Sequence, residues 1–177
     1  MYVLLNGAFG IGKTTVARAL RRELPGAAIF DPEWVGFVLR RLPAYASSDY
    51  QHLPAWRRLA VLGARAFGVG RRIVIVPMAF SEIRYLDEVR APLAASGRPV
   101  LHFCLVAPLE VVRARLASRG ESLGDPRREW VHRRAAECCR AHDRAEFAIR
   151  VPAAEATPQE IAAGLAARIA RATAGSF

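Results

Sequence analysis

One lysine in a glycine-rich loop constrains this chain more than any other feature. The 177 residues include 26 lysines and arginines, and Lys13 is the only lysine among them. It lies in the segment 7–14, Gly-Ala-Phe-Gly-Ile-Gly-Lys-Thr, which has the pattern G-x-x-x-x-G-K-[ST]. A lysine ammonium is a compact charge on a slim stem, whereas an arginine fork is wide and planar, so lysine fits a tight loop of backbone amides. The loop therefore predicts a site for the phosphates of a nucleotide.

The residues on either side of the loop support this interpretation. Residues 2–5 form a short apolar run typical of a buried strand, and residues 13–24 carry apolar side chains at helical spacing. The backbone N–H groups of such a loop, and of the helix that follows it, attract anions. We expect Lys13 to reach the β- and γ-phosphates of ATP and the Thr14 hydroxyl to coordinate Mg²⁺. The predicted nucleotide-binding residues of the loop are Gly7, Ala8, Phe9, Gly10, Ile11, Gly12, Lys13, Thr14 and Thr15.

The length and the hydropathy pattern predict a single domain over residues 1–177. No apolar run approaches the roughly 18 residues of a membrane-spanning helix, and the N-terminus begins directly with the first predicted strand, so we expect a cytoplasmic protein without stable membrane insertion. The three cysteines have no metal-binding spacing. The formal net charge of +10 allows nucleic-acid binding. However, the arginines are spread along the chain without an aromatic-basic array, so we predict phosphate-bearing small ligands and no nucleic-acid partner.

Short β-rich runs alternate with longer helical patterns along the whole chain. This alternation predicts an α/β fold with three layers, in which helices cover a five-stranded parallel sheet. The predicted strands cover residues 2–5, 28–30, 73–76, 100–106 and 147–151, and the predicted helices cover 13–24, 33–42, 54–68, 82–96, 108–119, 127–145 and 158–172. The last helix has a capping box that begins at Thr157.

Ligands of open parallel sheets bind outside the carboxyl ends of the strands, so the residues that follow each strand are the candidates for chemistry. Asp31 and Glu33 follow the second strand. A carboxylate at Asp31 can accept a hydroxyl proton or hold Mg²⁺ through water, or it can simply cap the next helix. We favour the catalytic role for Asp31 and leave the capping role open. After the third strand, Pro77 and Met78 stand where nucleotide hydrolases carry an acid, which indicates the floor of a substrate pocket instead.

Arginines follow the fourth strand. Arg115 and Arg119 lie four residues apart, hence on one helical face, and lead into a polar, turn-rich segment that we predict to be a lid over about residues 118–130. We expect both to neutralise a transferring phosphoryl group, and Arg119 also to bind the nucleotide. A solvent-exposed arginine face is the alternative. Four more arginines are candidates to close the site from the far side: Arg127, Arg128, Arg133 and Arg134.

The region of about residues 33–68 is rich in aromatic residues with arginines between them, and we expect it to cover an acceptor substrate. Ordinary packing of these aromatic side chains is the alternative. The four histidines have no ligand spacing and are predicted to be structural. The predicted acceptor-binding residues are Glu33, Trp34, Phe37, Arg40, Trp56, Arg57, Pro77 and Met78.

Several motifs in order give the chain a family resemblance over roughly residues 1 to 150. The motifs are the loop from Asn6 to Thr14, Asp31-Pro32-Glu33 with Gly36-Phe37 and Leu39-Arg40, then Trp56-Arg57, and Ile75-Val76-Pro77-Met78. With these motifs the chain resembles the tunicamycin-resistance ATP-binding proteins of bacteria, which have a nucleoside-monophosphate-kinase-like P-loop fold. The resemblance implies ATP and Mg²⁺ as ligands, Asp31 as the base that follows strand two, and Arg119 as a lid arginine.

These observations together favour an ATP-dependent small-molecule phosphotransferase that acts on tunicamycin, as a monomer or homodimer. Its predicted catalytic residues are Lys13, Asp31, Arg115 and Arg119, with Thr14 and Asp31 as metal ligands. Two alternatives stay open at this point. One is a protein that sequesters the drug with ATP and transfers nothing, and the other is a kinase for a different nucleoside or small molecule.

Overall fold

A parallel β-sheet forms the centre of the molecule. The structure, a computed structural model, describes residues 1–39, 41, 50–121, 128–147 and 149–174. All neighbouring strands pair in parallel, in the order β2-β3-β1-β4-β5. The predicted α/β class and the five-stranded parallel sheet are confirmed. The strands are β1 (Tyr2–Gly7), β2 (Ala27–Ile29), β3 (Ile73–Pro77), β4 (Val100–Val106) and β5 (Ile149–Pro152).

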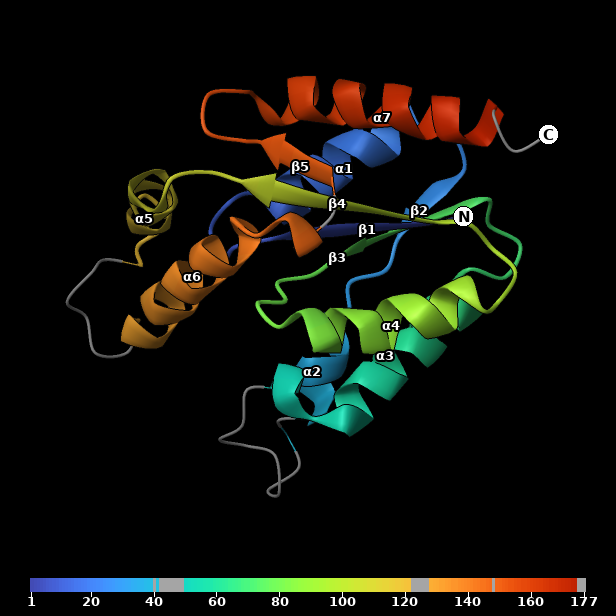
Figure 1. Cartoon of the computed structure of the whole chain (residues 1–177), viewed down its shortest axis with the longest axis horizontal. Helices are drawn as coiled ribbons and strands as arrows, with labels where there is room; N and C mark the ends of the chain where they lie inside the picture. The colour runs from blue at the N-terminus through green and yellow to red at the C-terminus, as the bar shows by residue number, and fades with distance from the viewer. Residues whose placement is uncertain (40, 42–49, 122–127, 148, 175–177) are drawn as a thin grey trace.

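Helices cover both faces of the sheet. Figure 1 shows α1 and α7 above the sheet and α3 and α4 below it, with α6 at the end where the strands point. The observed boundaries lie within about three residues of the predicted ones, and residues 122–127 of the predicted lid lie outside the described part of the chain. The helices are α1 (Lys13–Glu23), α2 (Glu33–Leu39), η2 (Tyr50–His52), α3 (Pro54–Phe67), α4 (Ile83–Ala94), α5 (Leu109–Ala117), α6 (Glu129–His142), η3 (Ala145–Phe147) and α7 (Pro158–Ala174).

Successive side chains of β1 point to opposite faces of the sheet and are buried on both. Val3 and Leu5 belong to the apolar cluster between the sheet and the helices α1 and α7. Tyr2 and Leu4 belong to the cluster on the other face, between the sheet and the helices α3 and α4. A parallel sheet covered by helices on both faces needs such a continuous apolar strand, which is what the first residues of the sequence provide. The next residue on the α3–α4 face is Asn6, which is polar and fully buried.

The capping box at the start of α7 is confirmed. The Glu160 N–H donates to the Thr157 hydroxyl at 3.2 Å, and the Thr157 N–H donates to the Glu160 carboxylate at 2.8 Å. These two reciprocal bonds satisfy backbone donors that a helix leaves unpaired at its first turn. The helix α7 therefore begins at Pro158, the position that the sequence pattern predicted.

Candidate functional site

The glycine-rich loop joins β1 to α1 with a backbone that glycine alone adopts without strain. Gly10 and Gly12 have positive φ angles of 82° and 106°. A Cβ atom on Gly10 would lie 2.6 Å from Cγ of Leu116, so α5 also packs too closely for a larger residue. Helix α1 then begins with no side-chain cap and no acid in its first turn. Its first N–H groups therefore face the loop, where they can bind an anion.

Lys13 lies inside this loop. Its ammonium donates to the Ala8 carbonyl at 2.9 Å and stands 5.5 Å from the Phe9 ring, and the residue is 8% exposed. Burial lowers the pKa of Lys13, while the carboxylates of Glu33 and Asp31 act in the opposite direction. Among the described residues only the Ala8 carbonyl accepts a hydrogen bond from this ammonium, which would gain further partners from a phosphate.

A cavity of about 470 Å³ opens in front of the loop. It brings Lys13 and Thr14 of α1 together with Arg119, which follows α5, and with Glu33 at the start of α2. These four predicted residues come from three separate segments, and the sheet places them around one space. The cavity is predominantly polar and carries more positive than negative charge, so it suits a polyphosphate.

Arg115 occupies a different place from the one expected for a phosphate-neutralising side chain. Its guanidinium donates to the carbonyl of Ile11 at 3.0 Å and to those of Ala153 and Ala154 at 2.7 and 2.9 Å. Among the described residues, Arg115 does not line the cavity in front of the loop. In this structure it braces the loop against the turn between β5 and α7.

Asn6, directly before the loop, ties the end of β1 to two other elements. Its side-chain oxygen accepts the N–H of Phe80 at 2.9 Å, and its amide nitrogen donates to the Phe80 carbonyl at 3.1 Å. His142, the last residue of α6, approaches the same carbonyl with Nε2 at 2.8 Å. The same Nε2 lies 3.1 Å from the amide nitrogen of Asn6. The loop, the segment after β3 and the end of α6 thus meet at Phe80.

Two buried histidines make the stability of the protein depend on pH. Burial lowers the pKa of His102 and of His142 to about 4, from an ordinary value of 6.5. The unfolded chain therefore binds more protons between pH 6.5 and 4. We expect the free energy of unfolding to be constant above about pH 7.5 and to fall as the pH drops through 6.5 toward 4, by up to about 1.4 kcal/mol per pH unit and histidine. Urea titrations at pH 7.5, 6.5, 5.5 and 4.5 measure this slope. It should be smaller in His142→Gln, and an identical slope in that variant would contradict the assignment.

Asp31 both caps a helix and faces the site. Its Oδ1 accepts the N–H of Glu33 at 2.9 Å, so the capping interaction considered from the sequence is present. Asp31 also lines a second cavity together with Thr14. Thr14 in turn borders the cavity of about 470 Å³ in front of the loop, which we call the phosphate cavity. Within the described residues the capping bond engages Oδ1 alone, so the cap and the catalytic role are compatible.

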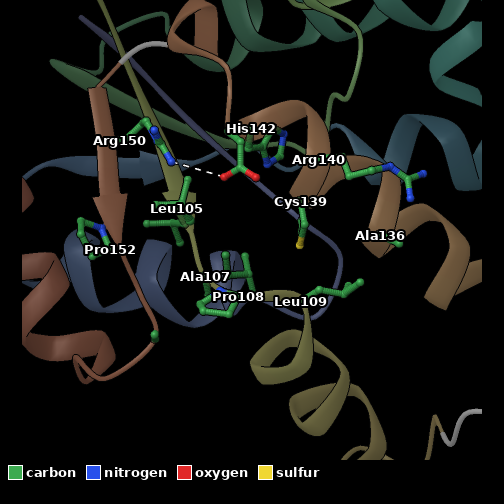
Figure 2. Close-up of a pocket in the computed structure, with 15 residues that line it drawn as sticks. Leu105, Ala107, Pro108, Leu109, Ala136, Cys139, Arg140, His142, Arg150 and Pro152 are labelled. Atoms are coloured by element: carbon green, nitrogen blue, oxygen red, sulfur yellow. Dashed lines mark hydrogen bonds and ion pairs between the residues drawn. The ribbon is translucent and has the colours of Figure 1, made fainter.

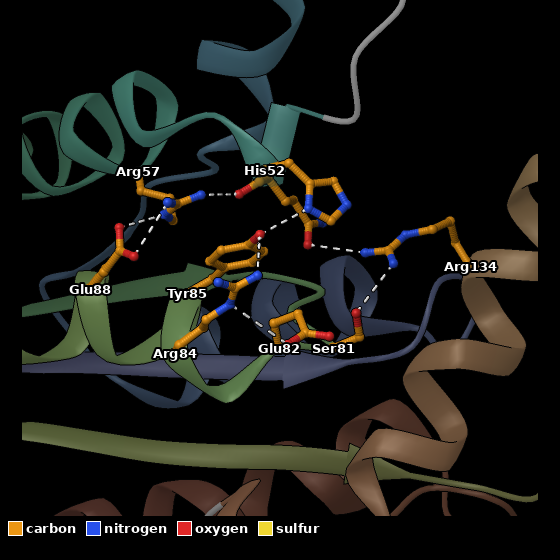
Figure 3. A network of polar contacts seen from close by, with 9 residues as sticks. His52, Arg57, Ser81, Glu82, Arg84, Tyr85, Glu88 and Arg134 are labelled. Carbon is orange, nitrogen blue, oxygen red and sulfur yellow. Dashed lines mark hydrogen bonds and ion pairs between the residues drawn. The ribbon is translucent and has the colours of Figure 1, made fainter.

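The predicted acceptor residues separate into buried and exposed groups. Trp56 is 2% exposed and donates from Nε1 to the Pro32 carbonyl at 3.0 Å. Arg57 is 4% exposed, and its guanidinium binds the Glu88 carboxylate at 2.7 Å and the Gln51 carbonyl at 2.6 Å (Figure 3). These contacts of Trp56 and Arg57 hold α3 in place, as the alternative of ordinary packing predicts. Trp34, in contrast, is 69% exposed. Pro77 ends β3 and Met78 is buried, whereas Arg40 and the Phe37 side chain lie outside the described part of the chain.

A further polar cavity, of about 510 Å³, lies beyond the end of β3. Arg134 of α6 donates to the Ser81 hydroxyl at 3.2 Å (Figure 3). It also forms an ion pair with Glu137 at 2.5 Å. His52 and Arg140 border the same cavity. The sequence analysis singled out Arg134 and predicted a structural role for His52, but it did not consider Ser81, although a polar residue so soon after an apolar strand end was a usable signal.

A mainly apolar cavity of about 430 Å³ lies behind the loop, between β4, β5 and α6. Figure 2 shows Cys139 beside it and an ion pair between Arg150 and Asp143 (3.3 Å) at its rim.

Burial raises the pKa of Cys104 to about 12 and that of Cys138 to about 11. These thiols are protonated at neutral pH and hence poor nucleophiles and metal ligands. The described residues contain no cluster of three or more metal-ligating histidine, cysteine or acidic side chains.

Comparisons with known proteins identify the family. The profile of an AAA domain matches residues 3–142. The solved structure of the tunicamycin resistance protein of Deinococcus radiodurans superposes with a TM-score of 0.76 and 30% sequence identity, over 95% of this chain and 94% of that one. This chain belongs to the tunicamycin resistance family, within the AAA-domain group. Among curated proteins, none matches it in sequence.

More distant structures share the fold of this tunicamycin resistance family member. A gluconokinase of Sinorhizobium meliloti has 17% identity and a TM-score of 0.66, over 99% of this chain and 97% of that one. A shikimate kinase of Bacteroides thetaiotaomicron has 15% identity and a TM-score of 0.59, over 98% of both chains. At such identities the likeness establishes a kinase-like P-loop fold and nothing about the acceptor.

In the part of the chain that the structure describes, no helix is both long enough and apolar enough to cross a membrane.

Proposed function

We propose that this protein transfers the γ-phosphate of ATP to a hydroxyl group of a small molecule, with tunicamycin as the first acceptor to test. The observation that carries the proposal is the phosphate cavity, in which Lys13, Thr14 and Arg119 surround one space at the start of α1. Phosphoryl transfer depends mainly on positioning and on stabilising negative charge, and these residues supply both. The family name of the Deinococcus relative supports tunicamycin as the acceptor.

Each residue has a definite task in this proposal. The loop amides and Lys13 bind the β- and γ-phosphates, and Arg119 neutralises charge that develops on the transferred group. Asp31 orients the acceptor hydroxyl and accepts its proton as the oxygen attacks phosphorus. Arg115 contributes indirectly, because it holds the Ile11 carbonyl and thereby the shape of the loop.

The chain also offers oxygen ligands for Mg²⁺. The Thr14 hydroxyl and the carboxylates of Asp31 and Glu33 border adjoining cavities. Mg²⁺ prefers a few protein oxygens, waters and substrate phosphates to a closed protein cage, so this donor set fits it. When bound, the ion would supply positive charge between the phosphates.

A sequestering protein without transfer is the second candidate. Two observations favour it: Pro77 and Met78 stand at the end of β3 where an acid would hold the metal directly, and Asp31, the proposed base, also caps α2. In that case ATP would bind in the same cavity and the drug would be retained unchanged.

Mass spectrometry of the drug separates the two candidates. We expect tunicamycin incubated with protein, ATP and Mg²⁺ to gain one phosphoryl group, about 80 Da, and ADP to form in equal amount. The Lys13→Ala variant serves as the control, because it should produce neither. Tight binding of ATP and drug with an unchanged drug mass would instead support sequestration.

A further inference from the structure

A second groove beside the phosphate cavity combines a cationic face with an aromatic wall. It has a volume of about 500 Å³ and lies at the edge of the sheet, between α1 and the segment from β2 to α2. We call it the edge groove. It shares Thr14 and Arg18 with the phosphate cavity. Its described lining residues are Thr14, Arg18, Arg21, Arg22, Ile29, Phe30, Asp31, Trp34 and Phe67.

Three arginines make up the cationic face. Arg18, Arg21 and Arg22 are exposed on α1 at spacings of three and four residues, so their charges lie side by side along the helix. Within the described chain, none of the three forms an ion pair or hydrogen bond. The helix dipole favours Arg21 and Arg22 in the last turn, but it does nothing for Arg18 in the middle of α1. A bound anion would remove the repulsion among them.

The aromatic wall stands opposite these arginines. The rings of Phe30 and Phe67 lie 5.9 Å apart, and Trp34 is 69% exposed. Phe30 reaches α3 because residue 63 is a glycine, where a Cβ atom would lie only 2.5 Å from the Phe30 ring. A largely exposed tryptophan beside a cavity offers a flat apolar surface to a ligand.

We propose that the edge groove binds an amphipathic organic phosphate, with its anionic group on the α1 arginines and its aromatic or apolar part against Phe30, Trp34 and Phe67. The carboxylate of Asp31 at one end repels the anion, so the phosphate lies toward Arg21 and Arg22. The site is separate from the one that holds the phosphates of ATP, because Arg21, Arg22 and Trp34 do not line that cavity. Binding here requires no phosphoryl transfer.

The two-part recognition has a direct test with 1-naphthyl phosphate, which joins a flat ring to a phosphate. Calorimetry is carried out on the full chain saturated with a non-hydrolysable ATP analogue, so that the phosphate cavity is already filled. We expect 1-naphthyl phosphate to bind at least about tenfold more tightly than inorganic phosphate or 1-naphthol, each of which supplies one part only. Equal affinities for 1-naphthol and its phosphate, absence of binding, or binding that occurs only when the ATP analogue is omitted would overturn the proposal.

Variants locate the site. The double variant Arg21→Gln/Arg22→Gln and the single variant Trp34→Ala should each raise the Kd for 1-naphthyl phosphate at least about tenfold. The control is Arg168→Gln/Arg171→Gln, which removes two exposed arginines from α7. It should leave the Kd unchanged, and an equal loss in the control would show a general charge effect and refute the groove. All the measurements are made without transfer, so their failure is independent of the proposed kinase activity.

Discussion

Replacing Lys13 by alanine is expected to weaken ATP binding about 100-fold or more, equivalent to about 2.7 kcal/mol, while the protein stays folded. The loop amides and Arg119 remain, but the cation that meets the β- and γ-phosphates is lost. The fold should survive because, within the described residues, the Lys13 ammonium donates a hydrogen bond to the Ala8 carbonyl alone, and burial already lowers its pKa. Calorimetry with ATP gives the affinity, and thermal unfolding gives the stability.

The variant Lys13→Arg distinguishes charge from shape. It keeps the positive charge, but the wide guanidinium has little room in a loop where Lys13 is 8% exposed. We expect it to lose most of the ATP affinity as well. Native affinity in Lys13→Ala would show that the nucleotide binds elsewhere, and native affinity in Lys13→Arg would show that charge alone suffices.

Replacing Asp31 by asparagine is expected to lower phosphoryl transfer to tunicamycin by about 10²- to 10⁴-fold, the usual contribution of a general base. The stability should not change, because asparagine caps helices as well as aspartate does and its side-chain oxygen can accept the same Glu33 N–H. Mass spectrometry of the drug measures the transfer, and thermal unfolding measures the stability.

The variant Asp31→Ala is the matched control, since it removes both the carboxylate and the cap. It should lose transfer to the same degree and also about 0.5–2 kcal/mol of stability. If Asp31→Asn keeps full transfer while Asp31→Ala destabilises the protein, Asp31 serves only as the helix cap and the proposed mechanism fails.

The backbone course of the glycine-rich loop, from strand to helix, could be predicted because its parts are contiguous. Residues 7–14 determine the turn, the helix start and the position of Lys13 by local backbone geometry, in particular the positive φ angles at Gly10 and Gly12. The same holds for the strands and helices, whose apolar periodicity is a local property of the chain. Their observed boundaries follow the prediction closely.

The roles of the arginines could not be predicted, because a spacing does not reveal the partner of a side chain. The spacing of four residues between Arg115 and Arg119 predicted one helical face, but α5 ends at Ala117, so Arg119 lies beyond the helix and lines the phosphate cavity. Arg115 instead binds carbonyls of the loop and of the β5–α7 turn. Arg57 likewise binds Glu88, which lies 31 residues away. In each case the deciding partner is distant in the sequence.

The sequence by itself determined that this chain folds as a parallel α/β sheet with a phosphate-binding loop around its single lysine, since local periodicity and backbone constraints specify both. Only the tertiary structure decided what stands around that loop. It joined Asn6 and His142 at the Phe80 carbonyl and set the α1 arginines opposite Trp34. Such pairings depend on the strand order and on how helices pack across the sheet, which bring together residues that no local pattern connects.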